Sequence, residues 1–558
     1  MVATHRIQNL EQCSLVSAKN VEFLERRLNP VQAGSRPKCL EGTCENILQQ
    51  IYAWAKDSSQ KNILWLSGSP GAGKSAIAST VVSQLSEHQT TVAFCFQCGH
   101  AILSDPAVLW HTIAFGLASK DSAIQNDIVH FLQEKTMNFG SDIGDHFKHL
   151  IEGPLIKNCA VLSFKLPLVI IIDALDECSS SDSTSASRGI LLQTLKKWTQ
   201  LPKIFKLFVI ARYESDIANC LDDISQHIVL QTGNKATPQT SQDIQFFLNH
   251  HFSRIAMDYY PELSTWPEPG IIEQLTQQAA GLFIWAETII RFMKQSAPSE
   301  QLSLILDGML ATGDIDSLYL TILQHSFRSS NLESFNMVAG CIVLAQIPLT
   351  ICDLKELLDG VKTDVIKFVL NKLKPVILND NENGLQVRHQ SFAEFLKDSN
   401  RCTEAFVIDQ TKQSKRLALG CLRVMNGTGG LQFNICNLEI SYAFNDQILD
   451  LATRVKAAIS PHLSYACCFW AQHFQDIPKQ NSEPVFAEGV HKFSHTHLLH
   501  WLEVLSLINK VPVASRALNA ADHWFQVCTQ AYIGWIYSLN CFNSAIAIQY
   551  RAFSISCR

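Results

Sequence analysis

One stretch of the chain, residues 62–80, limits the possible folds more than any other. It begins with an apolar run, Ile63–Leu66, that is typical of a buried strand, and it ends with residues that favour a helix. Between the two lies the phosphate-loop pattern G-x-x-x-x-G-K-[ST], complete at every fixed position: Gly68, Ser69, Pro70, Gly71, Ala72, Gly73, Lys74 and Ser75. Strand, loop and helix come in the order that such a loop requires, which disfavours a glycine-rich turn without a ligand.

The residue types in this loop explain how it would hold a phosphate chain. Glycines let the backbone turn tightly, so that successive N–H groups point at phosphate oxygens, and the helix that begins near Lys74 adds a partly positive N-terminus. We expect the lysine to reach the β- and γ-phosphates and the Ser75 hydroxyl to bind Mg²⁺. The predicted nucleotide-binding residues run from Gly68 to Ala76.

Composition places the chain among globular proteins with several domains. It has 558 residues, 47% hydrophobic and 17% charged, enough for about three to five domains with apolar cores. The net charge of −6 gives no general attraction to nucleic acid or to an anionic membrane. The 18 cysteines are irregularly spaced, the N-terminus lacks the pattern of a secretion signal, and no apolar run is long enough to span a bilayer. We therefore expect a cytoplasmic protein with reduced thiols.

Apolar strands alternate with amphipathic helices over residues 37–235. After the loop helix, strands are expected at Thr91–Gln97, Leu168–Ile172, Leu207–Ile210 and Ile228–Leu230. This alternation predicts an α/β fold in which a parallel sheet is covered by helices on both faces. Ligands of such sheets bind at the carboxyl ends of the strands.

Acidic residues follow one of these strands. Val169–Ile172 runs into Asp173, and a β-branched strand that ends in aspartate is the Walker-B arrangement, in which the carboxylate lies near the bound metal. We expect this strand next to the phosphate-loop strand, with Ser75 and Asp173 as the Mg²⁺ ligands. Asp176 and Glu177 follow closely enough to orient a water molecule. A solvated acidic loop is the alternative, and the complete phosphate loop disfavours it.

A further strand ends in arginine. Leu207–Ala211 is apolar and leads directly into Arg212. At a strand end beside the nucleotide, a guanidinium group can sense the γ-phosphate. An arginine on the surface without such a role is the alternative interpretation.

These motifs resemble those of the NACHT family of signal-transduction ATPases, and in particular its fungal incompatibility-type members, which include nephrocystin-3-like N-terminal domains. The residues that carry the resemblance are Gly68–Ser75, Val169–Cys178, Phe208–Arg212, Gly281–Ala286 and His389–Leu396. A small residue after the first aspartate, followed by a second acidic pair, sets NACHT proteins apart from most other phosphate-loop ATPases. The resemblance covers residues 37–515.

The resemblance implies roles for the matching side chains. Asp173 would bind the metal, and three catalytic residues, Asp176, Glu177 and Arg212, would support hydrolysis and sense the γ-phosphate. His389 would reach back to the β-phosphate and hold a closed, ADP-bound form. A packing or surface histidine is the alternative for that residue.

The sequence departs from the family pattern at two positions. Ala211 stands where the family usually has Ser or Thr, and Cys44 stands where many relatives carry Arg. Both changes would weaken nucleotide sensing without abolishing binding.

The remainder of the chain is predicted to be mainly helical. A helix is expected to open at Thr240, with Asp243 completing a capping box. Residues 326–400 have the pattern of a winged helix with a hairpin around Asn383-Gly384, but their balanced charges disfavour DNA binding. The predicted domains are a short segment at 1–36, the P-loop NTPase domain at 37–235, a helical lid at 236–325, the winged helix at 326–400, a helical domain at 401–515 and a remnant at 516–558.

The function that the resemblance implies is an ATP/ADP-dependent signalling switch with Mg²⁺ as cofactor. Slow ATP hydrolysis or exchange would change how the domains pack and would drive self-association, in fungal self/non-self recognition or innate-immunity-like signalling. Two alternatives stay open: a non-catalytic nucleotide-binding scaffold or truncated relative, and a phosphate-loop kinase. Residues 80–170 contain no arginine for a kinase lid, which disfavours the second.

Overall fold

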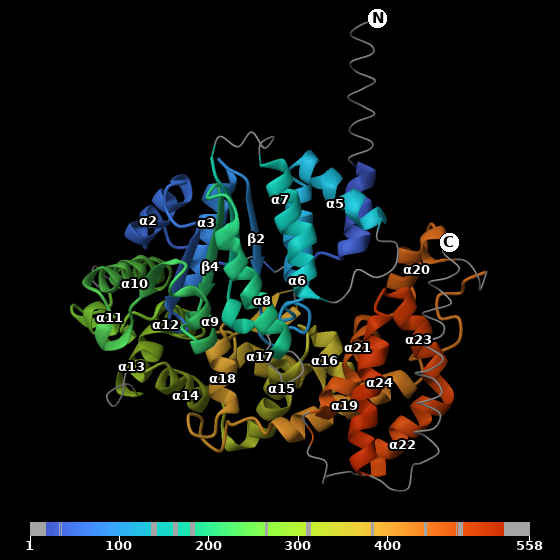
Figure 1. Cartoon of the computed structure of the whole chain (residues 1–558). Helices are drawn as coiled ribbons and strands as arrows, with labels where there is room; N and C mark the ends of the chain where they lie inside the picture. The colour runs from blue at the N-terminus through green and yellow to red at the C-terminus, as the bar shows by residue number, and fades with distance from the viewer. Residues whose placement is uncertain are drawn as a thin grey trace, which may run out of the picture. The chain divides into compact units, whose positions relative to one another are not determined.

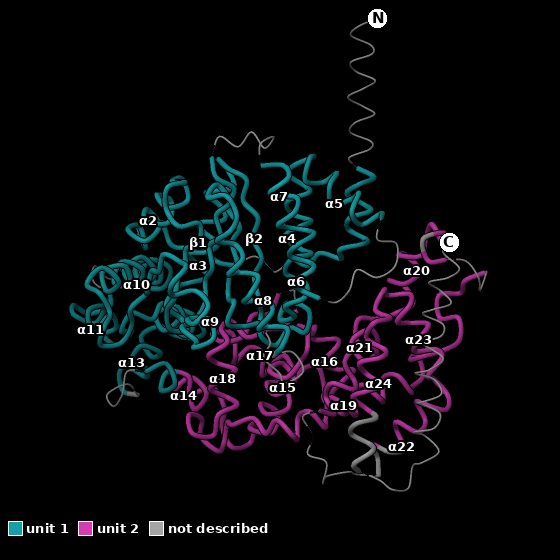
Figure 2. Tube along the Cα trace, viewed as in Figure 1, with its two compact units in different colours: residues 1–318 teal, residues 319–558 magenta. Residues whose placement is uncertain are grey.

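The computed structural model describes residues 18–32, 34, 36–134, 142–159, 166–178, 185–262, 266–308, 314–380, 384–439, 444–475, 477 and 484–528. The chain divides into two compact units, Met1–Leu318 and Tyr319–Arg558 (Figure 2). The predicted segments 1–36 and 516–558 lie partly outside the described residues, and so does Asn383 of the predicted hairpin turn. Among the helices that are described, none has both the length and the apolar character needed to cross a bilayer.

A five-stranded parallel sheet forms the centre of the first unit (Figure 1). Its strands are β1 (Ile63–Gly68), β2 (Thr91–Cys95), β3 (Leu168–Asp173), β4 (Phe205–Ala211) and β5 (Gln226–Leu230). They lie in the order β2-β3-β4-β1-β5, and every neighbouring pair is parallel. The predicted α/β class and its parallel sheet are confirmed.

The strand order corrects one expectation. The strand that carries Asp173 is not the neighbour of the phosphate-loop strand, because β4 lies between β3 and β1. Ser67 at the end of β1 pairs with Ala211 on β4, and Cys95 on β2 pairs with Asp173. The carboxyl ends of the four strands β1 to β4 still meet at one edge of the sheet, where ligands of parallel sheets bind.

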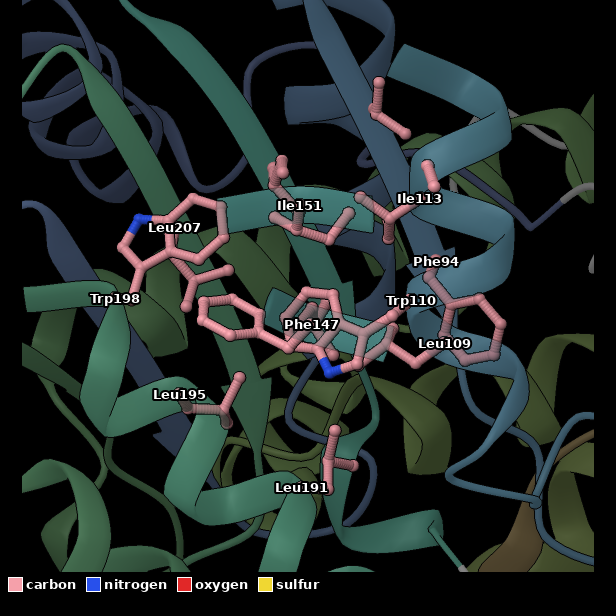
Figure 3. Packing of buried hydrophobic residues seen from close by; sticks show 14 of the residues in the cluster. Phe94, Leu109, Trp110, Ile113, Phe147, Ile151, Leu191, Leu195, Trp198 and Leu207 are labelled. Atoms are coloured by element: carbon pink, nitrogen blue, oxygen red, sulfur yellow. The ribbon is translucent and has the colours of Figure 1, made fainter. Parts of the chain in front are cut away.

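Alternate residues of the three central strands, β1, β3 and β4, enter two separate apolar cores, one on each face of the sheet. Ile63 and Trp65 of β1 belong to one core, whereas Leu64 and Leu66 belong to the other. In the first core, the indole rings of Trp110 and Trp198 are nearly parallel, with centroids 6.4 Å apart, and Phe147 packs against both. Figure 3 shows the three rings from close by. Burial on both faces explains why the strands are continuous apolar runs and why the sheet is rigid enough to position a site.

Helices surround this sheet and continue beyond it within the first unit. Residues 18–28 form a helix. The further α-helices are α2 (Glu45–Lys56), α3 (Lys74–Ser86), α4 (Val108–Ala118), α5 (Ser122–Glu134), α6 (Ile143–His146), α7 (Gly153–Asn158), α8 (Ser185–Lys197), α9 (Ser215–Leu221), α10 (Pro238–Tyr259), α11 (Ile271–Ala279), α12 (Phe283–Met293) and α13 (Pro298–Gly308), while α14 (Ile315–Ser326) contains the division between the units. A π-helical segment, η1 (Phe147–Glu152), connects α6 to α7.

The long helix α10 begins earlier than the sequence analysis predicts. Its N-cap is Thr237, whose Oγ1 accepts a hydrogen bond from the Thr240 backbone N–H at 3.1 Å, and its first residue is Pro238. The capping box expected at Thr240 is therefore wrong. Asp243 instead accepts a hydrogen bond from the backbone N–H of Cys44 at 3.1 Å, which ties α10 to the start of α2.

The described part of the second unit is helical apart from one hairpin. Its elements are α15 (Leu332–Leu344), α16 (Ile351–Leu357), α17 (Thr363–Lys372), β6 (Ile377–Asp380), β7 (Gly384–Val387), α18 (Gln390–Lys397), α19 (Gln410–Asn426), α20 (Leu451–Ala458), α21 (Pro461–Gln475), α22 (Pro484–Lys492), α23 (Leu498–Leu507) and α24 (Pro512–Cys528). Strands β6 and β7 pair antiparallel, and Leu349 forms an isolated bridge with Leu385. Three helices followed by a hairpin are consistent with a winged helix, whose boundaries stay a prediction.

Candidate nucleotide-binding site

The phosphate loop connects the end of β1 to the first turn of α3. Gly71 and Gly73 adopt left-handed backbone conformations, with φ of 82° and 95°, which side chains with a Cβ atom rarely adopt. A Cβ atom on Gly73 would also lie 3.4 Å from the ring of Phe283. The Ala72 backbone N–H donates to the Ser69 carbonyl at 3.2 Å. The glycines at these two positions are therefore required by the loop's own geometry.

Lys74 folds back over the loop. Its Nζ donates hydrogen bonds to the Gly68 and Ser69 carbonyl oxygens, at 2.8 and 3.0 Å. Burial lowers the pKa of this lysine, because a low-dielectric environment disfavours the charged form. Phosphate oxygens are stronger partners for an ammonium group than neutral carbonyls. The lysine thus lies at the loop, held by groups that an arriving phosphate chain can replace.

The two predicted metal ligands are brought together. Ser75 Oγ and Asp173 Oδ2 both accept a hydrogen bond from Nη1 of Arg36, at 2.9 and 3.2 Å. Asp173 is buried, and within the described residues its Oδ1 has no hydrogen-bond partner. A buried carboxylate with one unpartnered oxygen, beside a hydroxyl, is a donor set that Mg²⁺ accepts. The residues present therefore fit the metal that a phosphate-loop site implies.

The three predicted catalytic side chains take different partners. Arg212 Nε lies 3.0 Å from Asp176 Oδ2, and the backbone N–H of Arg212 donates to Asp176 Oδ1 at 2.9 Å. Both oxygens of Asp176 thus hold the arginine at the end of β4. Glu177 Oε2 accepts a hydrogen bond from the backbone N–H of Cys98 at 2.8 Å. Asp176 positions Arg212 in this arrangement, and the predicted roles in hydrolysis stay predictions.

Glu177 is a weak acid in this environment. Burial raises its pKa from 4.5 to about 7; the neighbouring carboxylates of Asp176 and Asp173 add to the rise, and the Cys98 N–H and the Arg36 guanidinium oppose it. Because the folded pKa lies above the unfolded value, the folded protein holds the proton more tightly. This contribution to stability is complete below pH 4.5 and is lost as the pH rises through about 7.

The Glu177→Gln variant should therefore be less sensitive to pH than the parent. Between pH 5 and pH 8 the parent should lose on the order of 2 kcal/mol of unfolding free energy that the variant does not lose. The melting temperature of the variant should therefore rise relative to that of the parent over this range. Thermal melts in EDTA, without nucleotide, measure this difference. A constant difference across that range would contradict the raised pKa.

The start of α12 contacts the phosphate loop within the first unit. The backbone N–H of Ile284 donates to the Gly71 carbonyl at 3.1 Å, and Phe283 lies beside Gly73. Thr232, just after β5, donates its hydroxyl to Ser69 Oγ at 2.8 Å. These contacts were not predicted from the sequence. The run Gly281–Ala286 is one of the motifs that resemble the NACHT family, but its sequence did not indicate a contact with the phosphate loop.

His389 lies in the second unit, at the N-cap of α18. Its Nδ1 accepts a hydrogen bond from the Ser391 backbone N–H at 3.2 Å and lies 2.7 Å from Ser391 Oγ. Ser391 Oγ also lies 2.9 Å from the Tyr319 hydroxyl. Through these contacts the histidine caps helix α18, which is a structural role. Its predicted contact with a β-phosphate stays a prediction.

Of the two departures from the family pattern, Cys44 is the more informative. It adopts a left-handed backbone conformation, with φ of 60°, and its backbone rather than its side chain binds Asp243. Ala211 is buried at the end of β4. The most prominent site residue that the sequence analysis missed is Arg36, which lies in a polar segment with no motif around it.

Sequence comparisons agree with this geometry. Residues 42–212 match the family described as Nephrocystin 3, N-terminal. Over 530 residues the chain is 23% identical to the Vegetative incompatibility protein HET-E-1 of Podospora anserina. The chain carries a NACHT-type NTPase domain. The alignment covers 87% of this chain and 37% of the relative, so the chain spans well under half the length of the protein that it matches.

The chain was also compared with solved structures, and its similarity to the two described next is remote. A STAND protein (Signal Transduction ATPase with Numerous Domains) with a tetratricopeptide repeat sensor, from Pyrococcus horikoshii, is 14% identical, with a TM-score of 0.40, covering 90% of this chain and 66% of that one. A Walker-type ATPase of Pyrococcus abyssi is 12% identical, with a TM-score of 0.33, covering 65% and 98%. The NACHT-type assignment rests on the sequence matches and on the loop, strand and acidic residues described above.

Proposed function

We propose that this chain is an ATP/ADP-dependent conformational switch. The phosphate chain would lie against the backbone N–H groups of Gly71–Ser75, with Lys74 on its β- and γ-oxygens. Mg²⁺ held by Ser75 and Asp173 would neutralise the charge that develops on the phosphates. Glu177 would accept a proton from the attacking water, and Arg212 would detect the γ-phosphate.

One observation favours a switch over a simple nucleotide-binding domain. The hydrogen bond from Ile284 to Gly71, together with the contact between Phe283 and Gly73, connects the first turn of α12 directly to the phosphate loop. A loop that reshapes around a phosphate chain changes these contacts, and a difference in contacts between two states is what shifts a conformational equilibrium. The helical segment after the sheet would in this way respond to the nucleotide.

The proposal extends to what the switch does. Slow turnover is expected, because a signalling switch works by staying in one nucleotide state. Self-association through the NTPase domain, and a role in self/non-self recognition of the kind that the name of the incompatibility protein describes, are further parts of the proposal. No effector or ligand is specified.

The nucleotide that accompanies the purified protein tests the proposal. We expect ADP at close to one molecule per chain, released by denaturation and quantified by anion-exchange chromatography. Exchange for a non-hydrolysable ATP analogue should then change the limited-proteolysis pattern and the sedimentation coefficient. A protein that binds both nucleotides with identical patterns would be a scaffold, and the switch proposal would be wrong.

A further inference from the structure

A short segment before α2 crosses the loop side of the sheet. Residues 31, 32, 34 and 36–39, here called the strap, lie along α3 and reach α4. Four hydrogen bonds hold them there: Val31 N–H to Thr112 Oγ1 at 3.2 Å, Ser79 Oγ to the Arg36 carbonyl at 3.0 Å, Lys38 Nζ to Ser83 Oγ at 2.7 Å and Cys39 N–H to Thr80 Oγ1 at 2.9 Å. The strap is therefore anchored on the same helix that begins with the phosphate loop.

The strap places one side chain at the metal ligands. Arg36 Nη1 bonds both Ser75 Oγ and Asp173 Oδ2, and its Nη2 donates to the Phe96 carbonyl at 3.2 Å. The Arg36 side chain is 28% exposed and that of Asp173 is 7% exposed, so the pair is largely shielded from water. A guanidinium is always charged and carries only donors. It therefore satisfies the oxygens that a metal ion would otherwise satisfy.

A guanidinium and a divalent cation cannot share these two oxygens. Both are positive, and at contact distance in a shielded site they repel each other strongly. Mg²⁺ bound by the unpartnered Asp173 Oδ1 and by Ser75 Oγ would lie beside Nη1, which bonds that hydroxyl and the other oxygen of the same carboxylate. The repulsion between the two cations therefore favours departure of Arg36 when the metal binds, and with it release of the part of the strap that Arg36 anchors.

We propose that Arg36 is a built-in counter-ion of the metal site, which Mg²⁺ must displace when the nucleotide loads. This inference rests on the proposed nucleotide site and adds its regulation. The N-terminal strap holds the metal-free site, and arrival of Mg²⁺ with nucleotide releases it. Occupancy of the site is in this way transmitted to the segment that precedes the NTPase domain.

A magnesium titration of the full chain tests the competition. Protein stripped of nucleotide is mixed with the fluorescent analogue mant-ADP in metal-free buffer, and binding is followed as MgCl₂ is added. We expect Arg36→Gln to lower the Mg²⁺ concentration at half-maximal binding by roughly tenfold, because a competing charge-assisted interaction is removed. Arg26→Gln makes the same substitution at an exposed arginine that pairs with Glu22 on the helix before the strap, and it should leave this concentration unchanged. Arg36→Lys should stay close to the parent.

Each outcome decides a separate question. If the parent does not bind mant-ADP, both the proposed nucleotide site and the role of Arg36 are wrong. If all proteins bind with the same Mg²⁺ requirement, the site stands and the competition is overturned. Weaker mant-ADP binding in Arg36→Gln at saturating Mg²⁺ would show instead that Arg36 binds the phosphates, which also overturns the proposal.

Proteolysis gives a readout that does not depend on affinity. The Lys38 side chain is exposed, but the hydrogen bonds of the Arg36 carbonyl and the Cys39 N–H hold the backbone on either side of it against α3, and trypsin needs that backbone free. Arg26 and Arg27, exposed on the preceding helix, serve as reference sites. Addition of Mg²⁺ with ADP should increase cleavage at Lys38 relative to those two sites, and ADP with EDTA should not. Equal cleavage in both conditions would contradict release of the strap.

Discussion

Replacing Lys74 by alanine should weaken ATP binding roughly a hundredfold, because the only lysine of the phosphate loop supplies a charge-assisted hydrogen bond to the β- and γ-phosphates. Among the described residues, its Nζ donates hydrogen bonds to the carbonyls of Gly68 and Ser69. Loss of two bonds to neutral carbonyls should cost little stability, so the folded variant can be compared directly with the parent. Isothermal titration calorimetry with ATP and Mg²⁺ measures the difference.

Lys61 offers a matched control for this variant. It precedes β1, and its Nζ also donates to two backbone carbonyls, those of Asp223 at 2.9 Å and Ser225 at 3.1 Å. Lys61→Ala removes the same chemistry at the opposite end of the strand, so we expect its ATP affinity to equal that of the parent. Should folded Lys74→Ala bind ATP as tightly as the parent, the nucleotide site described here is wrong.

The second large effect is expected from Glu177→Gln, which should reduce single-turnover ATP hydrolysis by about 10²–10³-fold and leave ATP binding within a few-fold of the parent. The amide cannot accept a proton from water, but it can still accept the hydrogen bond from the Cys98 N–H. The loss would therefore fall on the chemical step. Rapid-quench measurements with excess protein separate it from binding and product release.

Glu87→Gln serves as the control for loss of a negative charge. Glu87 is exposed and caps the far end of α3, so turnover should be unchanged. A parent protein that shows no hydrolysis would favour the non-catalytic scaffold. A variant that hydrolyses ATP as fast as the parent would show that Glu177 is not the base, and Asp176 would be the next residue to test.

Local patterns predicted the parts of the site that are local in sequence. The phosphate loop is one continuous motif whose glycines are demanded by backbone conformation at Gly71 and Gly73. The position of the acidic residues after Ile172 is likewise local, because it depends only on where one apolar strand ends. In both cases the residues that determine the structure lie within a few positions of one another, so a local sequence pattern is enough to predict it.

Contacts between distant segments were not predictable in the same way. The order of the strands depends on how the connections cross the sheet, and the apolar runs in the sequence carry no information about it. The position of β4 between β1 and β3 was for this reason not predicted. Arg36 lies 137 residues from Asp173 in the chain, and no pattern marks their contact. The start of α10 is a different case, because Thr237 directly before Pro238 is a local helix-start signal and it outweighs the pattern at Thr240.

The hydrogen bond between Ile284 and Gly71 also connects the two sites in the reverse direction, from helix α12 to the nucleotide. Thermodynamic coupling is reciprocal: if the nucleotide shifts α12, as proposed, then a force or partner that displaces α12 changes the affinity of the loop for the nucleotide by the same factor. A signal received elsewhere on the protein then needs no contact with the nucleotide to expel it. In the proposed switch, moving one backbone amide away from Gly71 is sufficient to change the affinity for the nucleotide.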